Sequence, residues 1–293
     1  MDGTREKKVV ALTSLVAAVL LTLFKAIVGV ATGSLGILSE AAHSGLDFAA
    51  ALMTYFAVSI SAKPADDSHH YGHGKFESFS ALFEVVLLLL TCGWIIYKAA
   101  HRLAGHRVEV EVNFWSFAVM GIAIVVDISR SRALMRVARR YGSQALEADA
   151  LHFQSDIYSS LVVIFGLLFT KAGFPVGDPL AALGVSILVM VASVRLAMRS
   201  SQVLLDRAPT GVEKNIRMAL DSMPQVAEVR KIRVRDAGTQ IFVDVTIAVD
   251  GSMSLDESHR VADETERHIA AMIPHVDVTV HVEPATHALS FDE

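Results

Sequence analysis

The chain has 293 residues, of which 53% are hydrophobic and only 19% are charged. Soluble globular proteins carry fewer apolar and more charged residues, so this composition predicts a protein with several membrane-spanning segments. The net charge of −5 at pH 7, without any basic domain, gives no indication of nucleic-acid binding, and the single cysteine excludes an intrachain disulfide and a thiolate metal cluster.

Six apolar stretches are long enough, at about 20 residues each, to cross a lipid bilayer. We expect them at Val9–Ala31, Leu35–Ile60, Phe79–Ala100, Phe114–Val137, Leu151–Ala172 and Pro179–Leu196. An even number of spans places both termini on one side of the membrane. Lys and Arg precede the first span and follow the second, fourth and sixth, which predicts cytoplasmic termini. No organelle-targeting segment is evident, so we expect a multi-pass protein of a bacterial inner (plasma) membrane.

Two of these spans contain a His and an Asp four residues apart in apolar surroundings. The pairs are His43 with Asp47, and His152 with Asp156. Residues four apart lie on one helix face, one turn from each other. Two such helices facing each other supply two nitrogen and two oxygen ligands, which suits a tetrahedral divalent metal and zinc best. A lone His or Asp could equally make a bond between helices, but two matching pairs predict a metal site.

Two further acidic residues, Glu84 and Asp127, lie within the third and fourth spans. Burying a carboxylate in lipid is costly unless it has a partner. These residues therefore either pair with neighbouring helices or line an aqueous cavity, and the sequence leaves both possibilities open.

The cytoplasmic loop between the second and third spans is rich in metal-binding side chains. The segment SAKPADDSHHYGHGKFES contains Asp66, Asp67, His69, His70 and His73. Imidazole and carboxylate groups at this density, with glycines that permit tight turns, predict a metal-capture site beside the intramembrane one. A solvated polar loop would have a similar composition.

The character of the chain changes at Asp206, where a soluble segment begins. A short helical pattern, two alternating segments, an amphipathic helix and a third alternating segment predict an α-β-β-α-β domain, suited to dimerisation or sensing. Strand alternation places Asp244, His281 and Glu283 on the outer face of this sheet, with His259 reaching in from the helix. These four residues are candidates for a shared metal site, although a solvated sheet face looks much the same.

These features together resemble the cation diffusion facilitator family over nearly the whole chain. The resemblance rests on SLGILSEAAHSGLD, SAKPADDSHHYGHGKFES, LEADALHFQSD and the α-β-β-α-β tail. It implies a six-helix transmembrane transport domain (residues 1–205) and a cytoplasmic, metallochaperone-like domain (residues 206–293). It also implies a homodimer that exports a divalent metal, with Zn²⁺ preferred, in exchange for protons.

The resemblance also assigns residues to sites. It implies a transport site of His43, Asp47, His152 and Asp156, and a loop site of Asp66, His69 and His73. In the tail the match is incomplete, because Arg230 and Thr246 stand where the family's zinc-rich site uses histidines. What remains, namely Asp244, His259, His281 and Glu283, could hold one labile, regulatory ion.

Three alternatives follow from the same residues. Fe²⁺, Cd²⁺, Co²⁺, Ni²⁺ or Mn²⁺ could be the cargo, since ligand type separates these ions poorly. An intramembrane zinc protease would require an HExxH motif, which the chain lacks, so we expect no enzyme. A membrane scaffold that senses metal without moving it would differ only in showing no flux.

Overall fold

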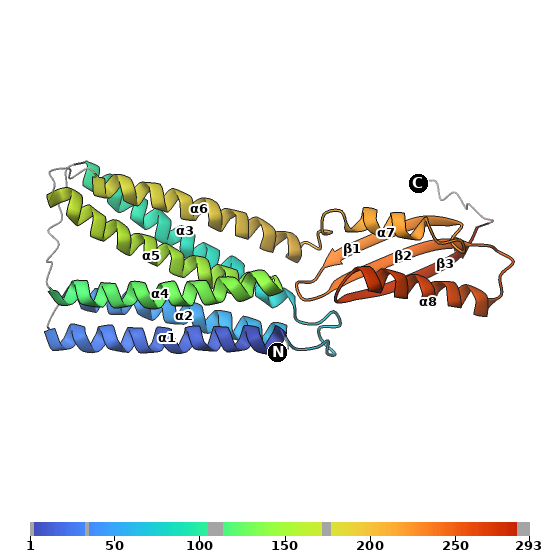
Figure 1. Cartoon of the computed structure of the whole chain (residues 1–293), viewed down its shortest axis with the longest axis horizontal. Helices are drawn as coiled ribbons and strands as arrows, with labels where there is room; N and C mark the ends of the chain where they lie inside the picture. Colours follow the sequence, from blue (N-terminus) through green and yellow to red (C-terminus); the bar gives the residue numbers. More distant parts are fainter. Residues whose placement is uncertain (1–2, 33–34, 105–113, 172–176, 286–293) are drawn as a thin grey trace. The chain divides into compact units, whose positions relative to one another are not determined.

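The computed structural model describes residues 3–32, 35–104, 114–171 and 177–285 (Figure 1). The chain divides into two compact units, Met1–Ser201 and Gln202–Glu293. The first unit consists of long helices and the second contains the sheet.

Six helices of 27–30 residues make up the first unit within the described ranges. At 1.5 Å per residue each is about 40–45 Å long, more than the roughly 30 Å of a bilayer's hydrocarbon core. They are α1 (Gly3–Thr32), α2 (Leu35–Ser61), α3 (Lys75–Leu103), α4 (Phe114–Tyr141), α5 (Gln144–Lys171) and α6 (Gly177–Leu204).

Three helical segments in the described part of the chain have the length and composition of a membrane span. They are Gly3–Ala31, Lys75–His101 and Ala182–Leu204, in α1, α3 and α6. Helices α2, α4 and α5 are as long, but they carry most of the acidic and histidine side chains discussed below. Composition therefore supports three of the six expected crossings, and the other three stay a prediction.

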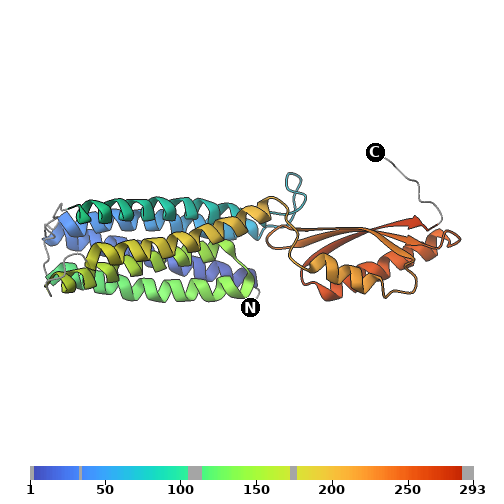
Figure 2. The same ribbon diagram turned by 90° about the horizontal axis from the view of Figure 1, so that it is seen from above.

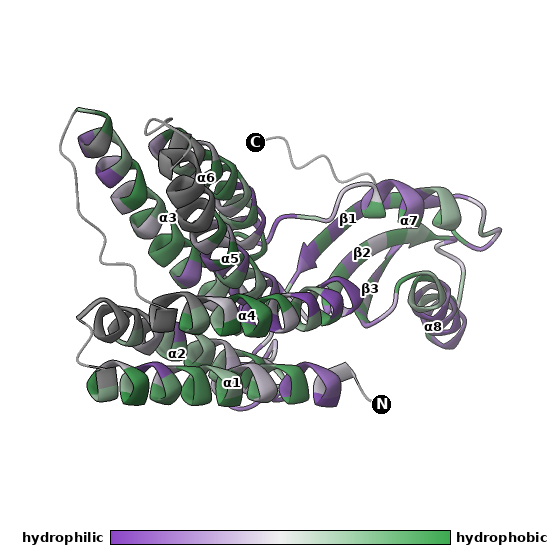
Figure 3. Ribbon diagram, turned by 60° about the vertical axis from the view of Figure 1, so that its left-hand side comes forward, coloured by the Kyte–Doolittle hydropathy of each residue, from purple (hydrophilic) through white to green (hydrophobic). Residues whose placement is uncertain are grey.

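Small side chains let the helices of the first unit pack closely. One buried cluster joins α1, α2, α4 and α5 through residues that include Ala11, Ala57, Ala138 and Ala145. A second cluster joins α3, α5 and α6. Large apolar side chains such as Leu20, Ile27, Leu90 and Val125 are exposed, as expected of a surface that meets lipid. Figure 3 shows hydrophobic residues along most of the length of these helices.

A two-residue turn joins α4 to α5 and sets the position of α5. Gly142 in this turn has φ 64°, in the left-handed region that glycine adopts without strain. Helix α5 begins at Gln144, seven residues before the predicted span, so His152 lies two turns inside the helix. The early start carries His152 into the bundle, opposite α2.

The second unit has the predicted α-β-β-α-β order. It contains α7 (Val212–Leu220), β1 (Glu228–Asp236), β2 (Ile241–Val249), α8 (Leu255–Met272) and β3 (Val276–Pro284). The strand order is β1-β2-β3, with β1 antiparallel and β3 parallel to β2. Both helices cover the same face of this mixed sheet, as Figure 2 shows. The predicted strand alternation is confirmed, because the valines at 243 and 245 are buried and Asp244 is exposed.

Candidate metal centres

The first candidate centre lies inside the helical unit, between α2 and α5. Asp47, His152 and Asp156 each offer one ligand atom, and these atoms all lie within 4.8 Å of one another. His152 Nε2 is 3.1 Å from Asp47 Oδ1 and 3.7 Å from Asp156 Oδ2. His152 and Asp47 are only 6% and 8% exposed, whereas the Asp156 side chain is 18% exposed, so the centre is buried on all but its Asp156 side. One imidazole and two carboxylates are a ligand set typical of zinc and related divalent metals.

The fourth predicted ligand, His43, lies in α2 one turn before Asp47. Its side chain falls outside the residues whose side chains the structure describes. Helical spacing alone puts it on the face of Asp47, and its part in the centre stays a prediction.

The second candidate centre is formed by the loop between α2 and α3. Ligand atoms of Asp66, His69 and His73 lie within 4.8 Å of one another. His73 Nε2 is 3.3 Å from Asp66 Oδ2, and the two imidazole rings have centroids 4.4 Å apart. His73 is buried and its Nδ1 lies 3.2 Å from the Pro64 carbonyl, whereas Asp66 and His69 are exposed. The loop therefore holds one ligand, His73, in a buried position and presents two ligands, Asp66 and His69, to the solvent.

A tight turn holds the carboxylate of this loop ready for a cation. The backbone N–H of His69 donates to Asp66 Oδ1 at 2.8 Å, and the hydroxyl and N–H of Ser68 donate to the same oxygen at 2.9 and 3.0 Å. These donors, with His69 the largest contributor, hold the pKa of Asp66 well below its ordinary value. Gly72, at φ 77°, turns the chain back towards α3. The other two polar loop residues, Asp67 and His70, are not part of the cluster.

A series of polar side chains, linked by hydrogen bonds, crosses the helical unit beside the first centre. Arg130 Nε and Nη2 both donate to Ser14 Oγ at 3.2 Å, and Ser14 donates to Asp149 Oδ2 at 3.4 Å. Arg130 also pairs with Asp127 at 3.4 Å and lies 3.6 Å from the centroid of the Phe153 ring. Asp127 thus has a partner on its own helix, an arrangement that differs from the two that the sequence analysis considered.

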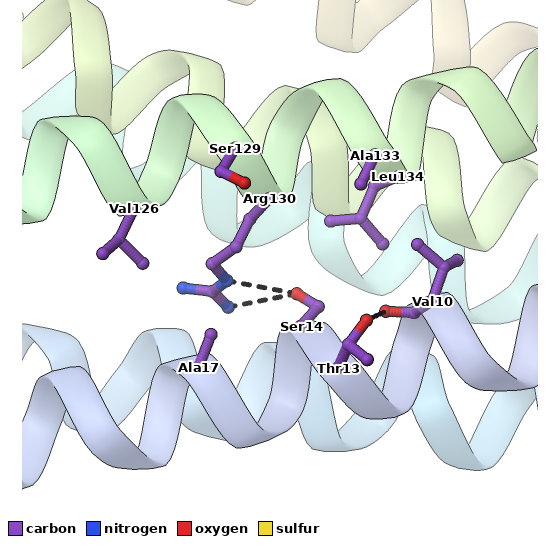
Figure 4. A pocket seen from close by; sticks show the side chains of 9 residues that line it. All are labelled: Val10, Thr13, Ser14, Ala17, Val126, Ser129, Arg130, Ala133 and Leu134. Atoms are coloured by element: carbon purple, nitrogen blue, oxygen red, sulfur yellow. Dashed lines mark hydrogen bonds between the residues drawn. The ribbon is translucent and has the colours of Figure 1, made fainter.

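The guanidinium group of Arg130 extends into a cavity of about 230 Å³ between α1 and α4 (Figure 4). The lining is mostly apolar, with Ser14 as the hydrogen-bond partner of the guanidinium group in the view. Sequence reasoning missed Arg130 and Asp149 as members of this network. The available signal was the position of Asp149, which lies three residues before His152 and therefore on nearly the same helix face.

The tail residues do not gather as predicted. Among the described side chains, neither of the two groups with metal-site spacing includes a tail residue. Asp244 Oδ2 lies 3.8 Å from Arg233 Nε, and Glu283 is ion-paired with Arg230. His281 Nε2 is 3.6 Å from Glu283 Oε1.

His259 lies apart from Asp244 because it belongs to α8, which covers the opposite face of the sheet. It shares a groove of about 320 Å³ with Glu283, at the edge formed by β3. One chain therefore offers one close pair of these potential ligands, His281 with Glu283, and not a four-ligand site. His259 Nε2 instead lies 3.8 Å from Asp263 Oδ1 on its own helix.

The helical unit and the two clusters of potential metal ligands agree with the family comparison. Residues 11–205 match the cation efflux transmembrane domain, and residues 208–285 match the cytoplasmic domain of cation efflux proteins. The chain belongs to this family, the cation diffusion facilitators, whose members are cation efflux transporters.

Two similar proteins match over almost the full length, and a solved structure matches the tail alone. The magnetosome protein MamB of Magnetospira sp. (strain QH-2) is 33% identical over 274 residues, 90% of each chain. The cation-efflux pump FieF of Escherichia fergusonii is 31% identical over 270 residues, 92% of this chain and 90% of that protein. The solved metal-bound C-terminal domain of the CzcD transporter from Thermotoga maritima is 29% identical, covers 26% of this chain and 91% of that one, and has a TM-score of 0.25.

Proposed function

We propose that this protein exports Zn²⁺ from the cytoplasm in exchange for protons, as a homodimer in the inner membrane with both termini cytoplasmic. The observation that carries the proposal is the convergence of Asp47, His152 and Asp156 between two helices of a transmembrane domain. His43 would complete the set with a second nitrogen. Two nitrogens and two oxygens favour zinc over manganese or magnesium, which prefer six oxygens.

The coupling to protons follows from the contacts of His152. Its Nε2 lies within 3.7 Å of a carboxylate oxygen of both Asp47 and Asp156. A proton on this nitrogen and a metal ion compete for the same lone pair, so binding of metal releases a proton and binding of a proton releases metal. Alternating access would then let an inward proton gradient drive metal outwards.

The loop cluster would act before the transport site. Asp66, His69 and His73 sit in the loop that follows α2, the helix that also carries Asp47. Two exposed ligands can take a hydrated ion from the cytoplasm, and the buried His73 can retain it. We propose that this loop captures Zn²⁺ and raises its local concentration near the transport domain.

The tail would serve in dimerisation and sensing. Its sheet leaves one face uncovered by helices, which suits association with a second chain. Because Asp244, His259, His281 and Glu283 do not converge within one chain, a regulatory zinc ion there would need ligands from both protomers.

The test is Zn²⁺ flux into proteoliposomes under an imposed pH gradient. The parent protein is compared with Asp156→Ala and with Glu147→Ala, a control on α5 whose carboxylate instead pairs with Arg199 at 2.6 Å. We expect proton-driven flux that Asp156→Ala abolishes and Glu147→Ala retains. Flux that ignores the gradient would refute antiport. No flux of zinc, cadmium, cobalt, iron(II) or manganese from folded protein would favour a sensing scaffold.

A further inference from the structure

Polar residues recur every seven positions along the contact between α2 and α3. On α2 these are Asp47, Thr54 and Ser61, and on α3 they are Glu77 and Glu84. The Thr54 hydroxyl donates to Glu84, and the Ser61 hydroxyl donates to Glu77 at 2.9 Å. Seven residues are about two turns, or about 10 Å of helix. The polar pairs therefore follow one another from the metal centre towards the loop end of the bundle.

Glu84 is the unusual member of this series. Its side chain is fully buried, and its Oε2 has no hydrogen-bond partner among the described residues. No cation contacts it in the described part of the chain, whereas Glu77 accepts from Lys7 at 2.6 Å. An ionised carboxylate without a cation is very costly in such surroundings, so Glu84 is expected to carry a proton when no metal is bound.

A second buried carboxyl group accompanies Glu84 from α5. Asp149 is also fully buried, and its Oδ1 likewise has no hydrogen-bond partner within the described ranges. Ala81 and Val85, next to Glu84 on the same side of α3, pack in one cluster with Ala148 of α5. Both carboxyl groups therefore lie where α3 packs against α5. The charged and titratable groups that act on the pair are Arg130, His152 and Asp47.

We propose that Glu84 and Asp149 form a proton-binding site that holds one proton between them and releases it when a divalent cation occupies the Asp47–His152–Asp156 centre. The release follows from charge. Thr54, which binds Glu84, lies two turns from Asp47, about 10 Å along α2, and Asp149 lies three residues from His152, about 4.5 Å along α5. A dication in the centre therefore acts on both carboxyl groups through a medium of low dielectric. The carboxyl O–H bond breaks, its electron pair stays on the carboxylate, and the proton passes to water on the cytoplasmic side.

The proton held by Glu84 and Asp149 is not the one that metal displaces from His152 itself. It is an additional proton that the metal expels from a distance, on the side of the centre that faces the Glu77 end of the helices. The inference rests on the proposed function, because it requires metal at the first centre. It assigns a role to Glu84, for which the sequence left pairing and a cavity lining both open.

The experiment counts protons released per zinc ion bound. The full-length protein in detergent micelles is titrated with Zn²⁺ in weakly buffered solution containing a pH indicator, and bound zinc is measured by elemental analysis. Glu84→Gln keeps the size of the side chain and its bond from Thr54 but cannot ionise. We expect it to bind zinc and release about one proton fewer per ion than the parent. Glu84→Asp should restore release, and the surface control Glu147→Gln should match the parent.

Two results would decide against this inference. Equal proton release from the parent and Glu84→Gln would overturn it. Should Glu84→Gln fail to give a single folded species by size exclusion, Asp149→Asn makes the same measurement, and parent-like release from that variant overturns the proposal equally. Failure of the proposed function would give a different result. Asp156→Ala, introduced alone into the parent protein, would then leave zinc binding unchanged.

Discussion

The buried ion pair of α4 gives the sharpest prediction about stability. The side chains of Arg130 and Asp127 are only 5% and 12% exposed, and the guanidinium also bonds Ser14 and stacks on Phe153. Arg130→Leu removes the cation but leaves a buried carboxylate without it. Removing one partner of a buried pair typically costs about 3–5 kcal/mol, because the remaining charge is uncompensated.

The double variant separates charge from packing. Arg130→Leu with Asp127→Leu removes both charges together, and replacing a whole buried pair by apolar residues is often neutral or stabilising. The single variant should therefore lower the melting temperature by roughly 6–20 °C, at about 2–4 °C per kcal/mol for a large domain. The double variant should recover most of this loss.

The assay is unfolding in detergent, followed by circular dichroism, for the parent, the two single leucine variants and the double variant. Arg140→Leu is the control, since Arg140 pairs with Glu6 but is 66% exposed. Such a surface pair is worth about 0–1 kcal/mol, so this control should melt close to the parent. A loss at Arg130→Leu no larger than at Arg140→Leu would refute the reasoning, as would a double variant less stable than Arg130→Leu.

Three further predictions concern the loop and the tail. Asp66→Asn should weaken zinc binding by the loop at least about 10–100-fold, because the loss of an outer-shell partner alone typically costs that much. The affinity is measured by competition with a chelator, in a protein that also carries His152→Ala. Ser254→Ala should cost about 1 kcal/mol in denaturation of the tail, because Ser254 caps α8. Bonds from the backbone N–H of Ser254, and to a smaller extent from its hydroxyl, lower the pKa of Glu257 in the folded state. The contribution of the hydroxyl, which Ser254→Ala removes, is complete above about pH 4.3 and is lost as pH falls through the lower folded-state pKa. The Ser254→Ala difference should therefore shrink in acid, and a difference that grew would contradict this. Arg230→His should raise the zinc bound per chain by about one ion in elemental analysis, because it frees Glu283 and adds a nitrogen ligand.

The tail shows where local pattern stops being sufficient. Alternation along β2 and β3 correctly put Asp244, His281 and Glu283 on the outer face, because a strand's side chains point to alternate sides whatever surrounds them. It could not show that Arg230 reaches Glu283 across the sheet. Arg230 lies where the register of β1 on β2 shifts, between Val229 and Lys231, and strict alternation does not hold there.

The helical unit divides in the same way. The sequence by itself determined the long apolar helices and the spacing of His152 and Asp156, because the helical period is a local property of the backbone. Only the tertiary structure decided that His152 meets Asp47 of another helix, that Arg130 bonds Ser14, and that Glu84 is buried where α3 packs against α5. These contacts join residues far apart in the chain, and they depend on which helices pack together and at what height, which no local period specifies.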